Sequence, residues 1–409
     1  MRGTSRTVSL KACFTAALLV LLTACGGAPA PTTSNAGSSG GQPQTDAAGK
    51  VTCKTGPGVT DKTIRFGVSA ELSGKAALSG ANAKKSLDQA VTDINKAGGV
   101  LGKQVEVVYA DNQSTNPGAV NALNKSLSSD NVFAMIGPIR STQILAMNET
   151  IRSKKVPMVI GGTNPTLTEQ GNGLLFRFRP SDALTGNGMV AFAQKTFSPK
   201  KVAILHDSDA FGSGGADVIE QAAKAGGMEV MKASYTTGDK DYTAQLSSIK
   251  SFAPDVLFTY ATNSEDLVIF ARQIKELGIK TPVVGSPSVT SQVSFDLGQE
   301  FIQGWNAVVD FLLDSNAVNK EWAAEYKGQY GASPDLFGAW QRDAMYFMTA
   351  ALDKSGCDRE AFLKAMHEVS IDGVQGPLRS DATGDVNRNL LAVKVEGDKA
   401  VLVEAVKTK

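Results

Sequence analysis

From residue 62 onward, short apolar runs alternate with stretches in which apolar residues recur at helical spacing. A run of β-branched and apolar residues predicts a strand, and apolar residues three and four apart predict a helix. In the first half of the chain this places strands at 62–70, 103–111, 131–138 and 156–162, and helices at 81–99, 116–129 and 141–155. Strands that alternate with helices form a parallel sheet covered by helices on both faces.

The same alternation restarts after residues 176–188, so the chain contains two similar units. The second unit has predicted helices at 185–197, 213–226, 241–251 and 264–277, and strands at 201–207, 228–235, 255–261 and 281–286. Helices at 335–355 and 358–368 and two short strands around a turn end the chain. We expect an α/β fold with two doubly wound lobes, in which ligands bind beyond the carboxyl ends of the strands.

The N-terminal region has a different pattern. Arg2, Arg6 and Lys11 precede an apolar run that is too short to span a bilayer, and small residues precede Cys25. This pattern predicts an export signal at 1–24, and "LTAC" looks like the cleavage site of bacterial lipoproteins, which leaves a lipid on Cys25. The alternative is an ordinary secretory signal with Cys25 incidental. Residues 26–50 have no large apolar side chain, so we expect a flexible tether, which we place at 25–60.

Composition and charge argue against a nucleic-acid partner and against a metal site. The 41 Lys and Arg residues almost balance the 40 Asp and Glu residues, so there is no electrostatic reason to expect nucleic acid as a partner. The only histidines, His206 and His367, do not form a cluster with zinc-ligand spacing, and we expect neither a metal nor a cofactor.

Two cysteines remain after the signal and the lipid site are assigned. Outside the cytoplasm, a leftover pair such as Cys53 and Cys357 is more often bonded than free. On the chain-entropy model a disulfide across so long a loop would stabilise the fold by roughly 3–5 kcal/mol. Two separate buried thiols are the alternative.

Several short segments resemble the periplasmic solute-binding proteins of the leucine/isoleucine/valine type, which feed ATP-driven importers. They include "INKAGGVLGKQVEVVYADNQS", "FAMIGP", "VPMVIGGTNPTLT", "FRFRPSD", "VAILHDSDAFGSGGAD" and "GPLRSDATGD", and they run in family order from about residue 60 to the end. The resemblance implies a type I periplasmic binding protein fold, in which a three-strand hinge joins two lobes that close on a small molecule. It places lobe 1 at 61–182 plus 311–370 and lobe 2 at 183–310 plus 371–409.

Binding residues can be carried over from the resemblance. In "GPIRSTQ", the Ser141 and Thr142 hydroxyls and the free amides of a helix start can hold a carboxylate. Ser141 is also a candidate helix N-cap, and the two roles are compatible. Gly162 and Thr163 match positions that bond an amino-acid head group, with a simple turn as the alternative. Phe211 matches an aromatic that covers the ligand from the second lobe, with a core phenylalanine as the alternative.

Three further positions differ from the resemblance. Ser79 and Asn263 stand where the family has aromatic residues. Ser286 or Pro287 stands where branched-chain amino-acid binders place a glutamate for the ligand's ammonium. A buried ammonium without a carboxylate would cost several kcal/mol. Four acids could replace the glutamate: Asp207, Asp209, Glu265 and Asp266. The ligand therefore stays open between an amino acid, an amide and a carboxylate.

Enzyme signatures are weak in this sequence. After residue 41 it has no G-x-S-x-G nucleophile motif and no phosphate-binding loop, and His206 beside Asp207 ends a predicted strand, where a structural role is more common. We expect a monomeric, non-enzymatic solute receptor of an ABC importer, anchored by lipid in the cell envelope, with the permease as its partner. A ligand-binding sensor of the same fold is the alternative.

Overall fold

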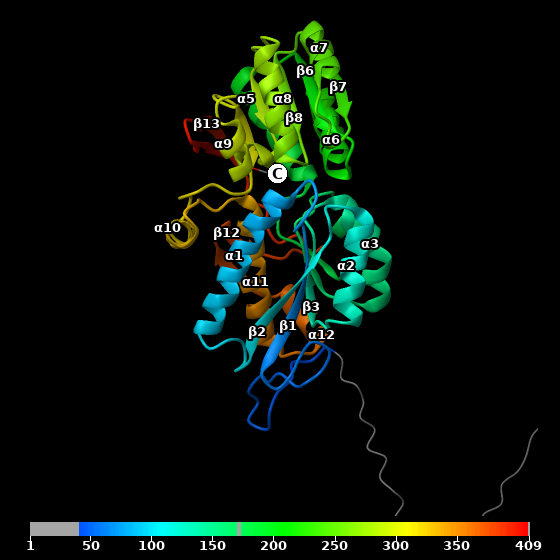
Figure 1. The fold of residues 1–409 in the computed structure, drawn as a ribbon, viewed down its shortest axis with the longest axis vertical. Helices are drawn as coiled ribbons and strands as arrows, with labels where there is room; N and C mark the ends of the chain where they lie inside the picture. Colours follow the sequence, from blue (N-terminus) through cyan, green and yellow to red (C-terminus); the bar gives the residue numbers. More distant parts are fainter. Residues whose placement is uncertain (1–40, 170–172, 408–409) are drawn as a thin grey trace, which may run out of the picture. The chain divides into compact units, whose positions relative to one another are not determined.

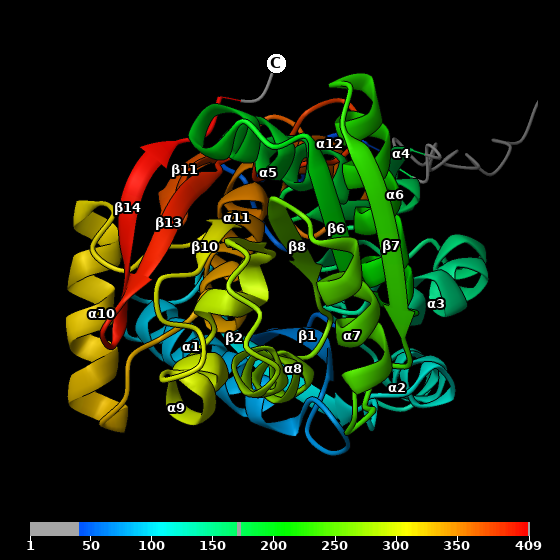
Figure 2. The ribbon, with the colours of Figure 1, turned by 90° about the horizontal axis from the view of Figure 1, so that it is seen from above.

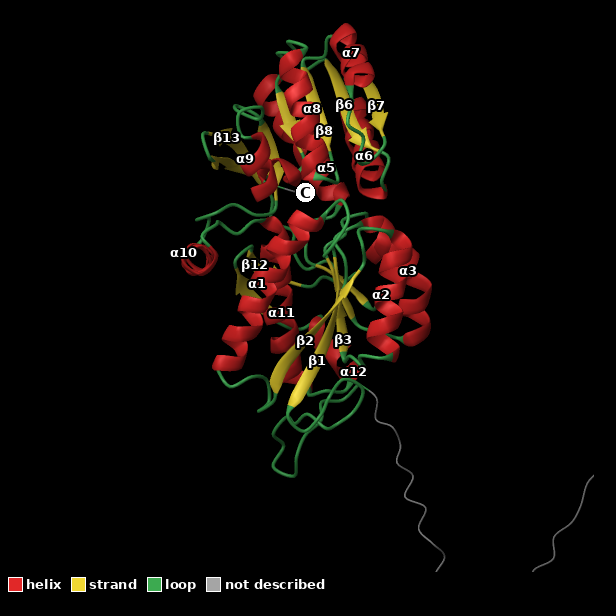
Figure 3. Cartoon of the chain, viewed as in Figure 1, coloured by secondary structure: helices red, strands yellow, loops and turns green. Residues whose placement is uncertain are grey.

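The computed structural model describes residues 41–169 and 173–407, which contain two large β-sheets (Figure 3). The first sheet is entirely parallel, with the strand order β2-β1-β3-β4-β5. Its strands are β1 (Thr63–Ala70), β2 (Gln104–Asp111), β3 (Ala134–Ile136), β4 (Met158–Ile160) and β5 (Leu175–Arg177). The central strands are buried apolar runs, as expected of a sheet covered on both faces.

Helices cover both faces of the first sheet (Figure 1). On one face, side chains of α1, α11 and α12 form a core with Phe66 and Val68 of β1. On the other face, side chains of α2 and α3 pack against Met135 and Met158. The helices of this lobe are α1 (Ala77–Lys96), α2 (Asn116–Ser128), α3 (Ser141–Lys154), α4 (Thr166–Glu169), α11 (Leu336–Ser355) and α12 (Arg359–Met366).

The second sheet has the order β14-β13-β10-β9-β8-β6-β7, and its strands are parallel except at β13 and β14. Its strands are β6 (Lys201–Asp207), β7 (Glu229–Tyr235), β8 (Val256–Tyr260), β9 (Val283–Gly285), β10 (Asn306–Val309), β13 (Leu391–Glu396) and β14 (Lys399–Ala405). Helices α5 and α6 pack on one face and α7 and α8 on the other (Figure 2). These helices are α5 (Asp182–Phe197), α6 (Ala210–Ala225), α7 (Thr243–Phe252) and α8 (Ser264–Glu276).

Smaller elements complete the described part of the chain. They are η1 (Pro287–Thr290), α9 (Gln292–Gly298), α10 (Ala317–Tyr330) and the hairpin of β11 (Ser370–Gly373) and β12 (Gly376–Arg379). Leu378 of this hairpin belongs to the core of the first sheet, together with α11. None of the helices in residues 41–169 and 173–407 combines the length and the apolar character needed to cross a membrane.

The described chain passes between the lobes at three segments, 178–182, 310–316 and 380–390. One ion pair joins the first two crossings, and a second joins the end of β5 to the third crossing. Arg179 Nε and Nη2 donate to the Asp310 carboxylate at 2.7 and 3.1 Å, and Arg177 Nε and Nη2 donate to Asp385 at 3.0 and 2.7 Å. The predicted α/β class, with parallel sheets flanked by helices, is confirmed. The residue boundaries of the two lobes stay a prediction.

Residues 41–60 require a correction to the predicted tether. Cys53 and Cys357 form a disulfide with their Cα atoms 4.7 Å apart, and Gln44 N donates to Ser355 O at 3.1 Å. Val59 is buried against the first lobe. These contacts hold the segment on the first lobe, although its composition suggested a tether. The predicted signal peptide at 1–24, the lipid site Cys25 and the tether up to residue 40 lie outside the described residues.

Candidate functional site

A pocket lies where loops after the parallel strands of both sheets meet the ends of α1 and α11. Glu71 follows β1 and Arg140 follows β3, whereas Asn263 follows β8 of the second sheet. The lining residues are Glu71, Ala76, Ser79, Gly80, Ala83, Ile139, Arg140, Thr262, Asn263, Phe337, Trp340 and Gln341. The cavity left between them is about 20 Å³ for the centre of a water molecule, which is room for about one water.

Arg140 carries the pocket's positive charge. It is the N-cap residue of α3 and only 3% exposed. Its Nη1 lies 3.4 Å from Asp209 Oδ2, its Nη2 donates to Asn263 Oδ1, and its Nε has no hydrogen-bond partner. A guanidinium has five N–H donors, so this side chain retains unused capacity. Both of its partners belong to the second lobe.

Glu71 is the acid that lines the same pocket. Burial raises the pKa of its carboxyl, and the nearby Arg140 charge partly opposes this effect. Its Oε1 atom has no hydrogen-bond partner, and neither have Trp340 Nε1 and Thr262 Oγ1. Buried polar atoms are nearly always paired in folded proteins, and an unpaired one costs about 1–3 kcal/mol. The pocket therefore offers both donors and acceptors to a bound molecule.

Further acids lie on the second-lobe side of the pocket. Burial raises the pKa of Asp207 to about 7, and Asp207 accepts hydrogen bonds from the backbone amides of Asp209 and Thr262. Burial also raises the pKa values of Glu265 and Asp266, and Asp266 accepts a bond from Gly238 N at 2.8 Å. Of these four acids, only Asp209 forms an ion pair with Arg140.

The structure brings some of the predicted ligand-binding residues to this pocket. Ser79 and Asn263 both line it and are buried. Thr142 instead lines a neighbouring, larger hollow together with Arg140 and Asp209, and its hydroxyl donates to Asp209 Oδ2 at 3.4 Å. Arg140 lines both spaces.

Ser141 and Thr163 lie behind the pocket rather than in its lining. Ser141 Oγ accepts hydrogen bonds from the amides of Thr163 and Asn164, each at 3.2 Å. The prediction that Ser141 caps the helix is wrong, because Arg140 occupies the N-cap position and Ser141 is the first helical residue. The Thr163 carbonyl accepts from Arg177 Nη1 at 3.1 Å and from Asp182 N at 2.8 Å. The direct solute contacts predicted for Ser141 and Thr163 stay predictions.

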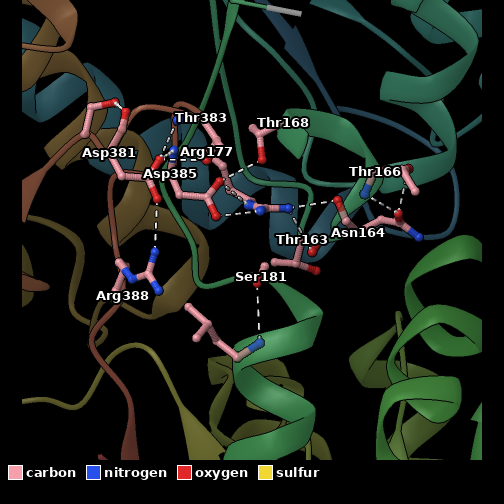
Figure 4. A network of polar contacts seen from close by, with 12 residues as sticks. Thr163, Asn164, Thr166, Thr168, Arg177, Ser181, Asp381, Thr383, Asp385 and Arg388 are labelled. Atoms are coloured by element: carbon pink, nitrogen blue, oxygen red, sulfur yellow. Dashed lines mark hydrogen bonds and ion pairs between the residues drawn. The ribbon is translucent and has the colours of Figure 1, made fainter. Parts of the chain in front are cut away.

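The polar network behind the pocket fixes the loop that carries Thr163 (Figure 4). Arg177 donates to the carbonyls of Thr163 and Asn164 and to both oxygens of Asp385. Thr168 Oγ1 donates to Asp385 Oδ1 at 2.7 Å. Because these groups are paired and most of them are buried, the network holds the loop in one conformation.

The two glycines of "VIGG" have different surroundings. A Cβ on Gly162 would lie 2.4 Å from Ile144 Cδ1, so a larger residue there would displace the end of the Ile144 side chain inside the first lobe. A Cβ on Gly161 would lie 2.7 Å from Cε2 of Trp340, which lines the pocket. Neither glycine has a positive φ, so the turn interpretation of these glycines is wrong. Contact of Gly162 with a solute stays a prediction.

Phe211 and Ser286 also lie outside the pocket lining. The Phe211 ring packs on Tyr260, with ring centroids 4.5 Å apart, in the core formed with α5 and α6. Ser286 is fully buried, and its backbone amide donates to Thr259 O at 2.9 Å. Their predicted ligand contacts stay predictions.

Sequence reasoning missed the charged and aromatic lining of the pocket. Glu71, Arg140, Phe337 and Trp340 were not proposed. Arg140 stands in the same "GPIRSTQ" loop as Ser141, and its charge at a helix N-terminus, where a cation is unfavourable, was an available signal. Phe337 and Trp340 gave no comparable signal, because aromatic residues on an apolar helix are usually core residues.

The fold and the pocket are those of a two-lobed receptor for a small molecule. Residues 63–400 match the family model for periplasmic binding protein, and the chain belongs to that family. The family consists of solute-binding receptors that act outside the cytoplasm, and it is not an enzyme class. Among the described residues, no group of three or more His, Cys, Asp or Glu side chains could hold a metal ion.

Curated relatives have similar length and low identity. The chain is 28% identical over 333 residues to the Leu/Ile/Val-binding protein homolog 3 of Brucella melitensis, covering 79% of this chain and 89% of that protein. It is 25% identical over 325 residues to the Leu/Ile/Val-binding protein of Escherichia coli, covering 79% and 88%.

Solved structures share the fold. The branched-chain amino acid transporter substrate-binding protein LivJ of Streptococcus pneumoniae, solved with isoleucine, superposes with a TM-score of 0.79 at 24% identity, covering 85% of this chain and 100% of that chain. An ABC transporter solute-binding protein of R. palustris, solved with benzoate, has a TM-score of 0.79 at 21% identity, covering 84% and 96%. The same fold thus accompanies different solutes.

Proposed function

We propose that this protein is the solute receptor of an ABC importer and that it traps a small polar solute, such as an amino acid or a related carboxylate, between its two lobes. The observation that carries the proposal is the pocket of Glu71, Arg140 and Asn263, which both lobes build and which contains buried polar atoms without partners. The named relatives that bind branched-chain amino acids support the same function. The protein releases its solute unchanged to a permease.

The closing motion follows from the connections between the lobes. Only the three crossing segments join the two sheets, so each lobe can rotate largely as a rigid body. In the structure, which contains no solute, Asn263 and Asp209 of the second lobe contact Arg140 of the first lobe. The solute would gain its affinity from donors and acceptors aligned on the first lobe and from contacts that the second lobe adds on closure.

A ligand screen tests this function directly. The full chain is scanned for thermal stabilisation by amino acids, their amides and small carboxylates, and the same compounds are assayed for turnover. A rise in melting temperature without turnover is expected, because binding to the folded state alone stabilises it. Chemical conversion of a hit, or the absence of any stabilising compound in all three classes, would contradict the proposal.

We also propose that the receptor is monomeric and held at the membrane by a lipid on Cys25. This residue follows an apolar run that ends in "LTA", and the described residues contain no membrane-spanning helix that could do this work. In cells that express the full chain, wild-type protein is expected in the membrane fraction, and Cys25→Ser is expected in the soluble extracytoplasmic fraction. Equal distribution of the two proteins between the fractions would contradict the lipid anchor.

A further inference from the structure

Resting on the proposed function, we propose that Arg140 selects the solute by binding its carboxylate, and that Asp209 and Asn263 occupy the place of this carboxylate when no solute is bound. The solute class is therefore a small carboxylic acid, and its anionic group is recognised by a guanidinium on the first lobe.

The hydrogen bonds of Arg140 are incomplete in a way that fits a missing oxyanion. The contact to Asp209 is long, at 3.4 Å, it involves a single oxygen, and Nε is buried without a partner. A carboxylate normally meets an arginine through two parallel bonds of about 2.7–2.9 Å. The two second-lobe residues give Arg140 an acidic oxygen and an amide oxygen from separate side chains, which reproduces the two acceptors without their ideal geometry.

Arg140 has no bidentate carboxylate partner, although Glu71, Glu265 and Asp266 also interact with its charge. Within the described residues, Asp209 is the only carboxylate that forms an ion pair with it, and no ion pair joins it to Glu71. The one ion pair is long, so a solute carboxylate that replaces Asp209 and forms two parallel bonds would be favoured at this position. The Asp209 Oδ1 atom is itself buried without a partner, so the pairing satisfies neither side chain fully.

The remaining lining residues indicate that the rest of the solute is apolar. Ile139, Phe337 and Trp340 present apolar surface to the pocket beside Arg140. The cavity holds about one water while Asn263 lines it and contacts Arg140, so a solute can enter only when the second lobe, which carries Asn263 and Asp209, withdraws. The solute carboxylate then takes over both contacts, and an apolar or aromatic group packs against Trp340.

Matched compounds separate a carboxylate from other polar groups. Calorimetric titrations at pH 7.5 compare 3-phenylpropionate with 3-phenylpropionamide, L-phenylalanine with L-phenylalaninamide, and L-leucine with L-leucinamide, together with every hit of the ligand screen. The acid of each binding pair should bind at least 30-fold more tightly than its amide. Arg140→Gln should abolish this preference, whereas Arg152→Gln, an exposed arginine on the same helix, should keep it.

Solution scattering of the solute-free proteins tests the second half of the proposal. Because Arg140 ties the lobes through Asp209 and Asn263, Arg140→Gln should have a larger radius of gyration than the wild type, and Arg152→Gln should not. Circular dichroism confirms that the variants are folded. Equal radii would overturn the substitute role of Asp209 and Asn263.

The outcomes distinguish the role of Arg140 from the receptor function. Hits that are mostly uncharged or cationic, or unchanged acid affinity in Arg140→Gln, would overturn the assignment of Arg140 and leave the receptor function intact. A screen without any ligand would overturn the receptor function and this assignment together.

Discussion

The hinge and the pocket both contain buried arginine, but the carboxylate partners of these arginines differ. Arg177 and Arg179 are as deeply buried as Arg140, with side-chain exposures of 0%, 6% and 3%. Each hinge arginine meets both oxygens of one aspartate at 2.7–3.1 Å. Arg140 instead has one long ion-pair contact and an unused Nε.

This difference separates a structural role from a binding role. A bidentate pair offsets the cost of burying both charges and fixes the two segments that carry it. The hinge arginines thus hold the chain crossings in register while the lobes move. Arg140 lacks such a partner, so its binding energy remains available to a solute.

Removal of a hinge arginine should have the largest effect. Arg177→Met leaves the Asp385 carboxylate buried without its cation and removes one of the donors to each of the Thr163 and Asn164 carbonyls. The free energy of unfolding should fall by about 3–5 kcal/mol, measured by urea denaturation. The double variant Arg177→Met/Asp385→Leu should recover part of the loss. A fall below about 1 kcal/mol would show that the hinge pair is not structural.

The disulfide should affect stability without affecting the pocket. Replacing Cys53 and Cys357 together by serine frees the segment before β1 and should lower the free energy of unfolding by about 2–4 kcal/mol. Solute affinity should stay within threefold of the wild type, because neither cysteine lines the pocket. A large loss of affinity at unchanged stability would be the opposite of this expectation.

Asp182, at the start of α5, is a buried acid that should make the stability of the protein depend on pH. Burial raises its pKa to about 6, and its Oδ1 accepts from Tyr260. The folded state therefore binds the proton of the Asp182 carboxyl more tightly than the unfolded state does. Ionised Asp182 lowers the free energy of unfolding above pH 6, and this loss disappears toward about pH 4. Asp182→Asn should be more stable than the wild type at pH 8 by about 1–3 kcal/mol, and this advantage should shrink as pH falls.

Thermal unfolding between pH 5 and pH 8 measures this difference. Asp241→Asn serves as a control, because Asp241 is exposed and its pKa is lowered by hydrogen bonds with Thr243, so that variant should gain nothing at pH 8. A pH-independent difference in stability between Asp182→Asn and the wild type would contradict the raised pKa of Asp182.

The smallest stability change is expected at Arg140 itself. Arg140→Gln removes one long ion pair and the bond to Asn263, and its amide can still donate, so the free energy of unfolding should fall by about 0.5–1.5 kcal/mol. The comparison with Arg177→Met uses the same urea titrations. A loss as large as that of Arg177→Met would mean that Arg140 serves the structure rather than the solute.

Periodicity predicted most of the fold because each strand and helix carries its own pattern. The helix expected at 141–155 is α3 at Ser141–Lys154, and the strand expected at 201–207 is β6. Helix starts were less accurate where the signal was a polar cap rather than an apolar face. The helix expected from 185 begins at Asp182, because Ser181 accepts a bond from Leu184 N and caps it.

The pocket was harder to predict than the sheets. Position after a strand identified the correct loops, and Ser79 and Asn263 do line the pocket. The partner of a side chain depends on three-dimensional contacts, however, and the sequence could not show that Ser141 bonds to the Thr163 loop while Arg140 points to the second lobe. The aromatic surface of Trp340 comes from a helix nearly two hundred residues further along the chain.

A crystal structure of the full chain with a carboxylate hit of the ligand screen tests the central claim most directly. The account predicts both carboxylate oxygens within hydrogen-bond distance of the Arg140 guanidinium, with Asp209 no longer in contact with it. A solute bound elsewhere, with the Arg140–Asp209 pair intact, would contradict the account.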